Sequence, residues 1–227
     1  WCASSRRLNA LDRSPFLIGA DIIQPADVVR NLGLQLDCDL SMTTYISKVV
    51  STCFGILRQL KSVGRSLPRD AKRQLIQTFV LSRLGYCNVA FAGIPKRQTD
   101  RLQSIINASA HLVSGTRKFD HITPVLRDDL HLLRVPERIE FKLCLLVHKC
   151  LHNMAPSYLQ DHIKPLSSDS SRSRLRSSKT GDVLIPLSHS RSGDRAFCVA
   201  GPRAWNKLPV DIKTADSLVN FKKLLKT

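Results

Sequence analysis

The sequence predicts a mainly helical fold with a small β component, that is, a mainly α (α+β) architecture. Over long stretches between residues 41 and 152, apolar residues recur at three- and four-residue spacing, which is the pattern of amphipathic helices. Two short extended segments flank Gly33, as in a β-hairpin. The apolar content of 43% suffices for a packed core and is too high for general disorder. These observations predict a hairpin followed by packed helices.

The hairpin is predicted from Val28–Leu32 and Leu34–Leu36, after a stretch with the Pro and Gly punctuation of short strands and turns. Ser41 stands where the N-cap of a long helix is expected, and Gly64 supplies a C-terminal stop. The apolar face of this helix consists of Ile46, Val49, Val50, Cys53, Ile56, Leu57 and Leu60.

Two further helices with short connections complete a predicted three-helix bundle. One begins near Ser66 with Pro68 in its first turn, and the other spans about Lys96–Val113. Their predicted apolar faces are Leu75, Ile76, Phe79 and Val80 in the first, and Leu102, Ile105, Ile106, Ala110, Leu112 and Val113 in the second.

The second half of the chain begins with a connector and a very apolar helix, about Pro136–His152. A helix that is apolar over most of its circumference is typically buried in a larger assembly. A short helical turn follows through Tyr158–Ile163, and then a Ser- and Arg-rich stretch, 164–195, predicts a flexible basic linker.

The C-terminal module is predicted to contain two short strands and a final helix. The predicted strands are Val183–Leu187 and Ala196–Val199. The sequence GPRAWNKLP that follows is predicted to form a turn. The final helix is expected to direct Leu218, Phe221, Leu224 and Leu225 inward and Lys222, Lys223 and Lys226 outward.

The charge balance points to a polyanionic partner. The chain has 35 Lys and Arg against 18 Asp and Glu, a formal charge of +17. Such a surplus favours nucleic acid over a membrane, although a basic protein with merely solvated charged faces is the plainer alternative. No apolar run approaches the roughly 20 residues of a membrane span, so no membrane partner is expected.

Seven cysteines, an odd number without a C-x-x-C pair, argue for a reducing compartment. We therefore expect an intracellular protein, nuclear or cytoplasmic and not secreted. The chain begins at Trp1 without an initiator Met or signal-peptide pattern, which suggests a fragment of a longer reading frame.

One stretch makes a family resemblance visible. VRNLGLQLDCDLSMTTYISKVVSTCFGILRQLKSVGR, from Val29 to Arg65, resembles the segment just after the catalytic palm in reverse transcriptases of LINE-type (non-LTR) retrotransposons, of the jockey and chicken-repeat branch. The similarity continues through LPRDAKRQLIQTFVLSRLGYCN, SGTRKFDHITPVLRDDL, VPERIEFKLCLLVHKCLHNMAPSYL and GPRAWNKLPVDI. In that family the Leu-Gly hairpin is the primer grip, and the next helix begins the thumb.

The resemblance implies the thumb and C-terminal region of an RNA-directed DNA polymerase. In the intact enzyme this region would grip the template–primer duplex, so RNA or RNA–DNA hybrid and the missing palm of the same polyprotein are the implied partners. The implied segments are a residual palm segment with the hairpin (1–40), a thumb-like helical bundle (41–115), a connector with the apolar helix (116–163), the basic linker (164–195) and the C-terminal module (196–227).

No catalytic centre is predicted in this chain. Nucleotide polymerisation needs carboxylates around two Mg²⁺ ions, and the aromatic-x-Asp-Asp turn of reverse transcriptases is absent. Asp128-Asp129 is the one Asp pair, but family members carry a single Asp followed by His-Trp-Leu-Pro, whereas Leu132 and Arg134 here replace Trp and Pro. We interpret the pair as a turn or helix cap, and we expect Mg²⁺ only in the missing palm, with no cofactor or small-molecule substrate here.

Other chemistries are also disfavoured. Cys144, His148, Cys150 and His152 lie within nine residues, but Cys150 projects away from the other three on a helix, so a core thiol with surface histidines is favoured over a metal site. No G-x-S-x-G elbow, Walker loop or G-x-G-x-x-G occurs.

Binding of nucleic-acid phosphates is therefore the predicted task. Gly33 would allow close backbone approach, unless it is an ordinary turn glycine, and Trp205 either stacks on a base or anchors the tail. The predicted contact residues are Gly33, Arg58, Lys61, Arg65, Lys72, Arg73, Arg97, Arg101, Arg117, Lys118, Arg172, Arg174 and Arg176. The alternatives are a protein-interaction module based on the apolar helix 136–152 and a degenerate transposon remnant without function.

Overall fold

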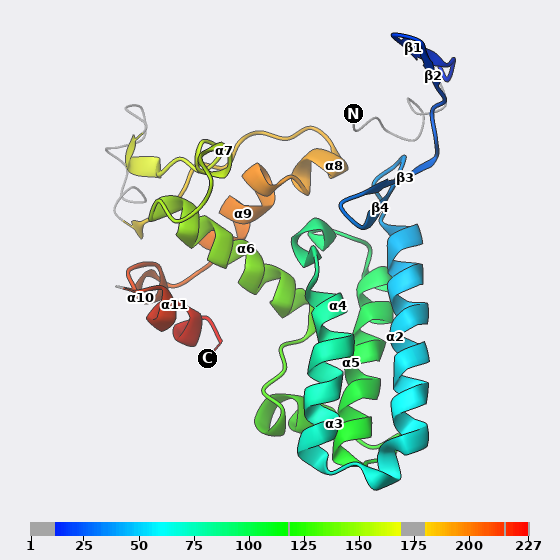
Figure 1. Ribbon diagram of the computed structural model, residues 1–227. Helices are drawn as coiled ribbons and strands as arrows, with labels where there is room; N and C mark the ends of the chain where they lie inside the picture. Colours follow the sequence, from blue (N-terminus) through cyan, green and yellow to red (C-terminus); the bar gives the residue numbers. More distant parts are fainter. Residues whose placement is uncertain (1–11, 118, 169–179, 216, 227) are drawn as a thin grey trace. The chain divides into compact units, whose positions relative to one another are not determined.

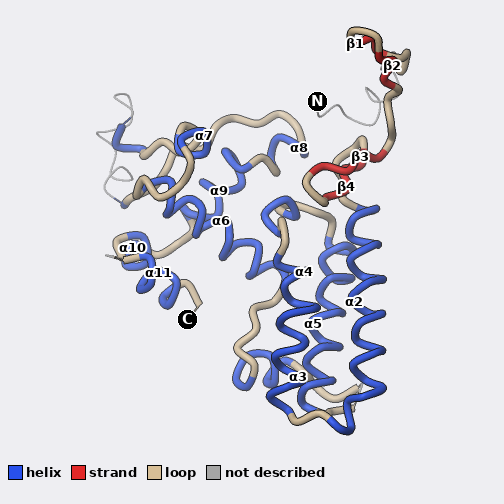
Figure 2. Tube along the Cα trace, in the orientation of Figure 1, coloured by secondary structure: helices blue, strands red, loops and turns tan. Residues whose placement is uncertain are grey.

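The computed structural model describes residues 12–117, 119–168, 180–215 and 217–226, with the backbone alone for Arg65. The described chain is mainly helical with two small antiparallel hairpins, which confirms the mainly α prediction (Figures 1 and 2). Its residues form two compact units. Unit 1 comprises Trp1–Cys87 and Ile94–His131, and unit 2 comprises Asn88–Gly93 and Leu132–Thr227.

Unit 1 begins with two hairpins. Strand β1 (Phe16–Ile18) pairs with β2 (Asp21–Ile23), and β3 (Val28–Asn31) pairs with β4 (Leu34–Asp37). The predicted hinge at Gly33 is confirmed, because Leu32 and Gly33 both have positive φ and form the two-residue turn between β3 and β4. Two positive φ angles match the right-handed twist of the flanking strands.

Helix α2 (Thr43–Val63) follows β4, but Ser41 is not its N-cap. The N-cap is Met42, which has φ 62° and makes no capping hydrogen bond with its side chain. Instead, Asp37 Oδ2 accepts hydrogen bonds from Ser41 Oγ (2.9 Å) and from the Thr44 amide (3.4 Å). A carboxylate is favoured at a helix N-terminus, so Asp37 at the end of β4 takes over the role predicted for Ser41.

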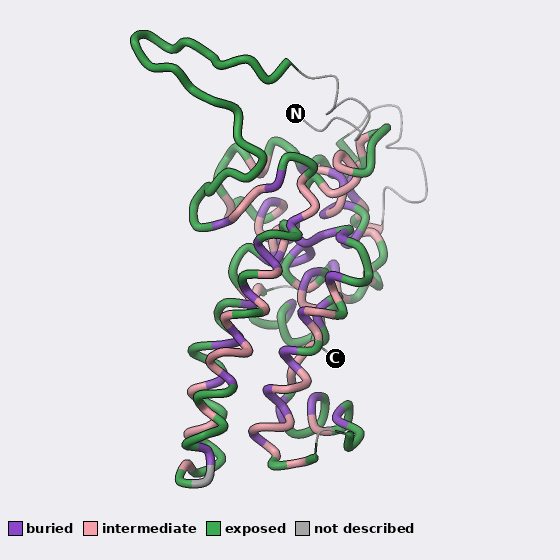
Figure 3. The backbone as a smooth tube through the Cα atoms, turned by 90° about the vertical axis from the view of Figure 1, so that its right-hand side faces the viewer, coloured by how far each residue is buried: buried purple, intermediate pink, exposed green. Residues whose placement is uncertain are grey.

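The remaining helices of the bundle are α3 (Arg69–Ile76), α4 (Ser82–Gly85) and α5 (Lys96–Ser114). A π-helical turn, Gln77–Leu81, joins α3 to α4. Both α2 and α3 pack on α5, and buried residues alternate with exposed ones along α2 (Figure 3). The core includes Tyr45, Ile46, Val49, Cys53, Leu57, Ile76, Val80, Leu102, Ile105, Ile106, Ala110 and Val113.

Of the residues predicted for the apolar faces of the bundle, Phe79 is exposed, and Val50, Ile56, Leu60, Leu75 and Leu112 are half-buried. Phe79 is 47% exposed, whereas Ile76 and Val80 are buried as expected. Phe79 lies in the π-helical turn, where a wider helical turn shifts the side chains that follow from the regular 3.6-residue spacing. Gly64 also differs in detail, since it ends α2 with a right-handed φ of −62° rather than the left-handed conformation of a glycine cap.

Unit 2 is built around α6 (Val135–Leu151), which matches the predicted apolar helix. Helix α9 (Phe197–Asn206) and the 3-10 turn Asn88–Phe91 pack on α6. Arg195 holds this turn, because its Nε donates to the Ala92 carbonyl (2.9 Å) and its Nη2 to the Ala90 carbonyl (3.1 Å). The short helices are α7 (Ser157–Gln160), α8 (Arg191–Asp194), α10 (Val210–Lys213) and α11 (Leu218–Leu224).

The predicted C-terminal strands are wrong. Ala196–Val199 begins α9, and the predicted GPRAWNKLP turn is helical through Asn206 despite the internal Pro202. Burial of Val199, Ala204 and Trp205 within unit 2 outweighs the local preference of Gly-Pro for a turn. In place of the strand Val183–Leu187 there is a single bridge between Val183 and Pro165, so both described ends of the predicted 164–195 linker are ordered in unit 2.

The final helix is also less buried than predicted, since Phe221 is its one buried residue and Leu224 is 36% exposed. Among the described residues, no helix is both long enough and apolar enough to cross a membrane.

Candidate nucleic-acid interface

The solvent-facing side of α2 carries cations, hydroxyls and amides but no carboxylate. Its helical sequence, TTYISKVVSTCFGILRQLKSV, has no Asp or Glu at any position. We name this surface the α2 face and define it by the exposed residues Thr43, Thr44, Lys48, Ser51, Arg58, Gln59, Lys61 and Ser62. The exposed face of an ordinary helix carries both acidic and basic residues. Helix α2 differs from such a helix because none of its 21 residues is acidic.

Most of the predicted cations whose side chains the structure describes lie at one end of the bundle. Arg58 and Lys61 are on the last turns of α2, Lys72 and Arg73 are on α3, and Arg117 follows α5. These helix ends lie together in Figures 1 and 2. Contacts at Gly64 agree with this arrangement, because a Cβ added there would be 3.8 Å from Leu112 Cδ1 and 3.9 Å from Lys72 Cε.

At least three acids share this end of the bundle, because Asp129 pairs with Arg69 at the start of α3. Asp70 is in the first turn of α3, and Asp120 Oδ2 accepts a hydrogen bond from the Arg117 amide at 2.7 Å. The side chains of Arg58, Lys61, Arg73 and Arg117 are exposed, and Lys72 is half-buried. The structure thus brings five predicted residues to one region with a cationic excess.

Arg97 and Arg101 lie at the opposite end, beside the start of α2. Arg101 donates to Gln98 Oε1 (3.0 Å) and to Ser47 Oγ (3.1 Å), so it ties α5 to α2. Fourteen residues separate Ser47 from Lys61, which corresponds to about 21 Å along a helix. The predicted residues therefore do not form one compact cluster, and Arg101 has a structural role that the sequence did not indicate.

Gly33 is at the exposed tip of the β3–β4 hairpin with φ +83°. The Tyr86 hydroxyl donates a hydrogen bond to the neighbouring Leu32 carbonyl and holds this tip. A Cβ at Gly33 would be 3.7 Å from the Tyr86 oxygen, so there is room for it, and the positive φ is what requires glycine. The turn between β3 and β4 therefore explains the glycine at this position, and no bound ligand is needed to explain it.

Four predicted contact residues, Lys118, Arg172, Arg174 and Arg176, lie outside the described residues, as does the side chain of Arg65. Asp128 and Asp129 are exposed in the π-helical turn Val125–Asp129, where Asp129 pairs with Arg69. Within the described ranges, no three His, Cys, Asp or Glu side chains are placed to hold a metal ion.

The prediction of surface histidines on α6 is half wrong. His152 is exposed, but His148 is only 1% exposed and lies between the rings of His152 and Phe221. No described residue bonds either ring nitrogen. Burial, followed by the nearby His152, lowers the pKa of His148 from 6.5 to about 4. Cys144 and Cys150 are buried as expected of core thiols.

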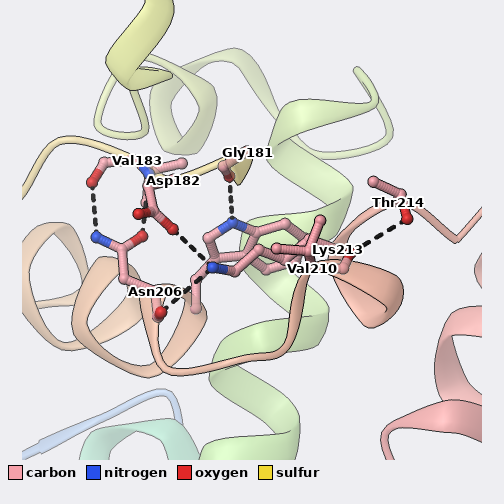
Figure 4. Close-up of polar contacts among 8 residues, drawn as sticks. Gly181, Asp182, Val183, Asn206, Val210, Lys213 and Thr214 are labelled. Carbon is pink, nitrogen blue, oxygen red and sulfur yellow. Dashed lines mark hydrogen bonds and ion pairs between the residues drawn. The ribbon is translucent and has the colours of Figure 1, made fainter. Parts of the chain in front are cut away.

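Trp205 anchors unit 2 and is not available to stack on a base. Its side chain is 1% exposed, and its Nε1 donates to the Gly181 carbonyl at 2.9 Å. Next to it, Lys213 Nζ donates to Asp182 Oδ1 (2.6 Å) and to the Asn206 carbonyl (3.2 Å), as Figure 4 shows. The Asn206 amide also bonds both the N–H and the carbonyl of Val183. Residues 181–183 are thus fixed to α9 and α10.

The sequence reasoning missed the hydroxyl and amide members of the α2 face and Lys48. The usable signal was the absence of acids from residue 43 to residue 63, which can be read directly from the sequence. Hydroxyls and amides also donate hydrogen bonds to phosphate oxygens, but they carry no charge and so are less conspicuous in a sequence.

Comparisons with known proteins give no match. No protein family, curated protein or solved structure is similar to this chain. The function must therefore be argued from the chain's own residues.

Proposed function

We propose that unit 1 binds the phosphate backbone of an RNA–DNA hybrid or RNA duplex, as the thumb of a LINE-type RNA-directed DNA polymerase would. The observation that carries the proposal is the α2 face, an exposed helical surface with cations and hydroxyls and no carboxylate. Residues of these types make most protein contacts to phosphate and sugar, and such contacts position a duplex without reading its sequence.

Gly55 supports the proposal independently of charge. It lies on the same side of α2 as Ser51 and Ser62, and a Cβ added to it would have no atom within 4 Å. A glycine inside a helix costs about 1 kcal/mol relative to alanine, and its usual benefit is close approach by another backbone. The packing of the bundle does not require glycine here, and the open space at Gly55 suits close approach by a partner backbone.

The proposed role is non-catalytic. Gripping a duplex needs only phosphate contacts, whereas phosphoryl transfer needs metal-binding carboxylates, which we assign to the palm of the same polyprotein. The β1–β2 hairpin fits that arrangement, because Phe16, Leu17 and Ile22 are exposed on its two faces. An isolated two-stranded hairpin is only marginally stable, so a neighbouring sheet would stabilise it.

The test is a binding titration of the full chain with a 20-base-pair RNA–DNA hybrid at several salt concentrations, followed by fluorescence anisotropy. For the double variant Arg58→Gln/Lys61→Gln, we expect weaker binding and a salt dependence shallower by about 2, since each lost phosphate contact removes about 0.9 from the slope. The matched control is Lys96→Gln/Arg13→Gln, because Lys96 pairs with Asp100 at 2.8 Å and Arg13 with Asp27 at 2.9 Å. Equal slopes in both variants, or no binding by the parent chain, would contradict the proposal.

The competing protein-interaction function loses its main support. Its basis was the broad apolar surface of α6, and within unit 2 this surface is covered by α9, by the turn Asn88–Phe91 and by Phe221 of α11. The apolar residues of α6 are thus explained by the fold of unit 2.

A further inference from the structure

Two ring contacts hold α11 and the residues just after it on α6. Phe221 stacks on His148 with ring centroids 4.3 Å apart, and Lys226 Nζ lies 5.9 Å from the centroid of the Phe141 ring. From the first contact to the second, the residue number in the C-terminal segment rises by five, from 221 to 226, and the residue number on α6 falls by seven, from 148 to 141. The two helices therefore run antiparallel, and α11 is fixed with one face against unit 2.

Lysines are exposed on this segment. Lys222 and Lys223 are exposed on α11, and Lys226 follows the helix with an exposed side chain whose Nζ lies at the edge of α6, over the Phe141 ring. On α6, Lys142 follows Phe141 and Lys149 follows His148. Each lysine is therefore one residue, or about 100° around the helix, from one of the two rings in these contacts. We call these five residues, Lys142, Lys149, Lys222, Lys223 and Lys226, the lysine face.

The acids of these two helices lie elsewhere. Helix α11 has no carboxylate, and the two of α6 are Glu137 and Glu140. Glu137 accepts a hydrogen bond from the Arg134 amide at 2.9 Å, and Glu140 lies 3.8 Å from Lys207 Nζ. Both are about 140–200° around α6 from Lys142. Helices α6 and α11 thus place no carboxylate beside these lysines, and the prediction of contact residues from the sequence included none of them.

We infer that the lysine face is a second nucleic-acid backbone surface, carried by unit 2 and separate from the α2 face. Repeated cations at helical spacing without intervening acids match the phosphates of a polynucleotide. An anionic membrane fits less well, because an interfacial helix needs a broad exposed apolar face, whereas α11 turns Phe221 inward and exposes only Val219 and Leu224 beside its lysines. The inference rests on the proposed function only in that both surfaces would bind the same nucleic acid.

The experiment uses the full chain and the same 20-base-pair RNA–DNA hybrid. For Lys222→Gln/Lys223→Gln/Lys226→Gln we expect affinity to fall at least tenfold at low salt and the salt slope to become shallower by about 2 to 3. The matched control removes three exposed cations from other parts of unit 2, Lys164→Gln/Arg191→Gln/Lys207→Gln, and we expect it to lower the slope by less than 1.

Lysines in the last turn of a helix also stabilise that helix through its dipole, so thermal unfolding is measured for each variant. If the α11 variant unfolds, Lys142→Gln/Lys149→Gln replaces it, with an expected slope change of about 1 to 2. An unchanged slope in a folded lysine-face variant overturns the inference, as does a larger loss of binding to phosphatidylserine vesicles than to the hybrid. The Arg58→Gln/Lys61→Gln variant decides the proposed function separately, because it leaves the lysine face intact.

Discussion

The imidazole of His148 stacks on the ring of Phe221, with ring centroids 4.3 Å apart and an interplanar angle of 28°. His148 belongs to α6 and Phe221 to α11, and both side chains are almost fully buried. This contact fixes the last helix of the chain, and it also places an ionisable ring in the apolar interior of unit 2. The ring must therefore stay neutral for α11 to remain packed.

We predict that the chain loses stability as the pH falls below about 6.5 because of His148. Its pKa in the folded state is lowered from 6.5 to about 4 by burial, so above 6.5 the ring is neutral whether the chain is folded or unfolded. Between 6.5 and 4 the unfolded chain binds a proton that the folded chain does not, and the folded state is penalised by up to about 3 kcal/mol.

The measurement is urea unfolding at pH 7.5 and pH 4.5 for the parent chain and for His148→Leu. The leucine variant should retain more of its stability on acidification, because it has no ring to protonate, and at pH 7.5 it should be no less stable than the parent. Other acidic groups titrate equally in both chains. An identical loss in the two chains would show that His148 is not responsible.

We predict that Lys213→Ala destabilises unit 2 by about 3 kcal/mol. The Lys213 side chain is 4% exposed and pairs with Asp182 at 2.6 Å, so its removal leaves a poorly solvated carboxylate without its cation. The double variant Lys213→Met/Asp182→Asn should recover part of this loss, since replacing both members of a buried pair is often nearly neutral. Urea unfolding of both variants at pH 7 measures the two effects. A double variant as unstable as Lys213→Ala would mean that the ion pair is not the cause.

We predict opposite effects for alanine at two glycines of unit 1. Gly33→Ala should destabilise the chain by about 1 to 2 kcal/mol, because φ +83° strains any residue with a Cβ. Gly55→Ala should stabilise it by about 1 kcal/mol, because Gly55 is helical and its added Cβ meets no atom within 4 Å. Thermal unfolding distinguishes the two directions.

The same glycine offers a further check on the α2 face. If a nucleic-acid backbone approaches Gly55 closely, Gly55→Leu should weaken binding of the RNA–DNA hybrid several-fold while leaving the charge of the surface unchanged. Lys48 and Arg58 remain in place in this variant. If Gly55→Leu binds as tightly as the parent chain, the nucleic acid contacts only the ends of the side chains around Gly55 and does not approach the helix backbone there.

We predict selective alkylation of the thiols. Burial raises the pKa of Cys53 to about 11 and that of Cys144 to about 12, so neither forms a reactive thiolate near pH 8. Cys38 and Cys87 are exposed and should react with iodoacetamide first. Mass spectrometry of tryptic peptides after brief labelling measures the order. Labelling of Cys53 at the rate of Cys38 would contradict the packing of the bundle.

Several elements could be predicted from the sequence because their signals are local. The spacing of Ile46, Cys53 and Leu57 is enough to place α2, and the turn at Gly33 is enough to place the β3–β4 hairpin. The periodicity of a long amphipathic helix repeats over many residues, so one misleading residue does not hide it.

Features set by tertiary contacts could not be predicted in this way. Gly201-Pro202 has the local preference of a turn, yet α9 continues through it because Trp205 must reach the interior and bond the Gly181 carbonyl. The capping of α2 by Asp37 depends on the fold of the hairpin before it. His148 looked like a surface histidine because the helices that cover it come more than forty residues later.

The candidate site was predicted in part. The cations Arg58, Lys61, Lys72, Arg73 and Arg117 lie in one region because α2, α3 and α5 alternate in direction, which short connections make predictable. Arg101 could not be separated from them by sequence, since only the structure places Ser47 and Gln98 beside its guanidinium.

The bonds from Arg195 to the Ala90 and Ala92 carbonyls have a practical meaning for anyone who divides this chain. Six residues in the middle of the first unit's sequence belong to the second, so no single cleavage point yields two intact halves. A polypeptide stopped after His131 would keep those carbonyls and lose the guanidinium that donates hydrogen bonds to them. The units are best studied by substitution within the whole polypeptide.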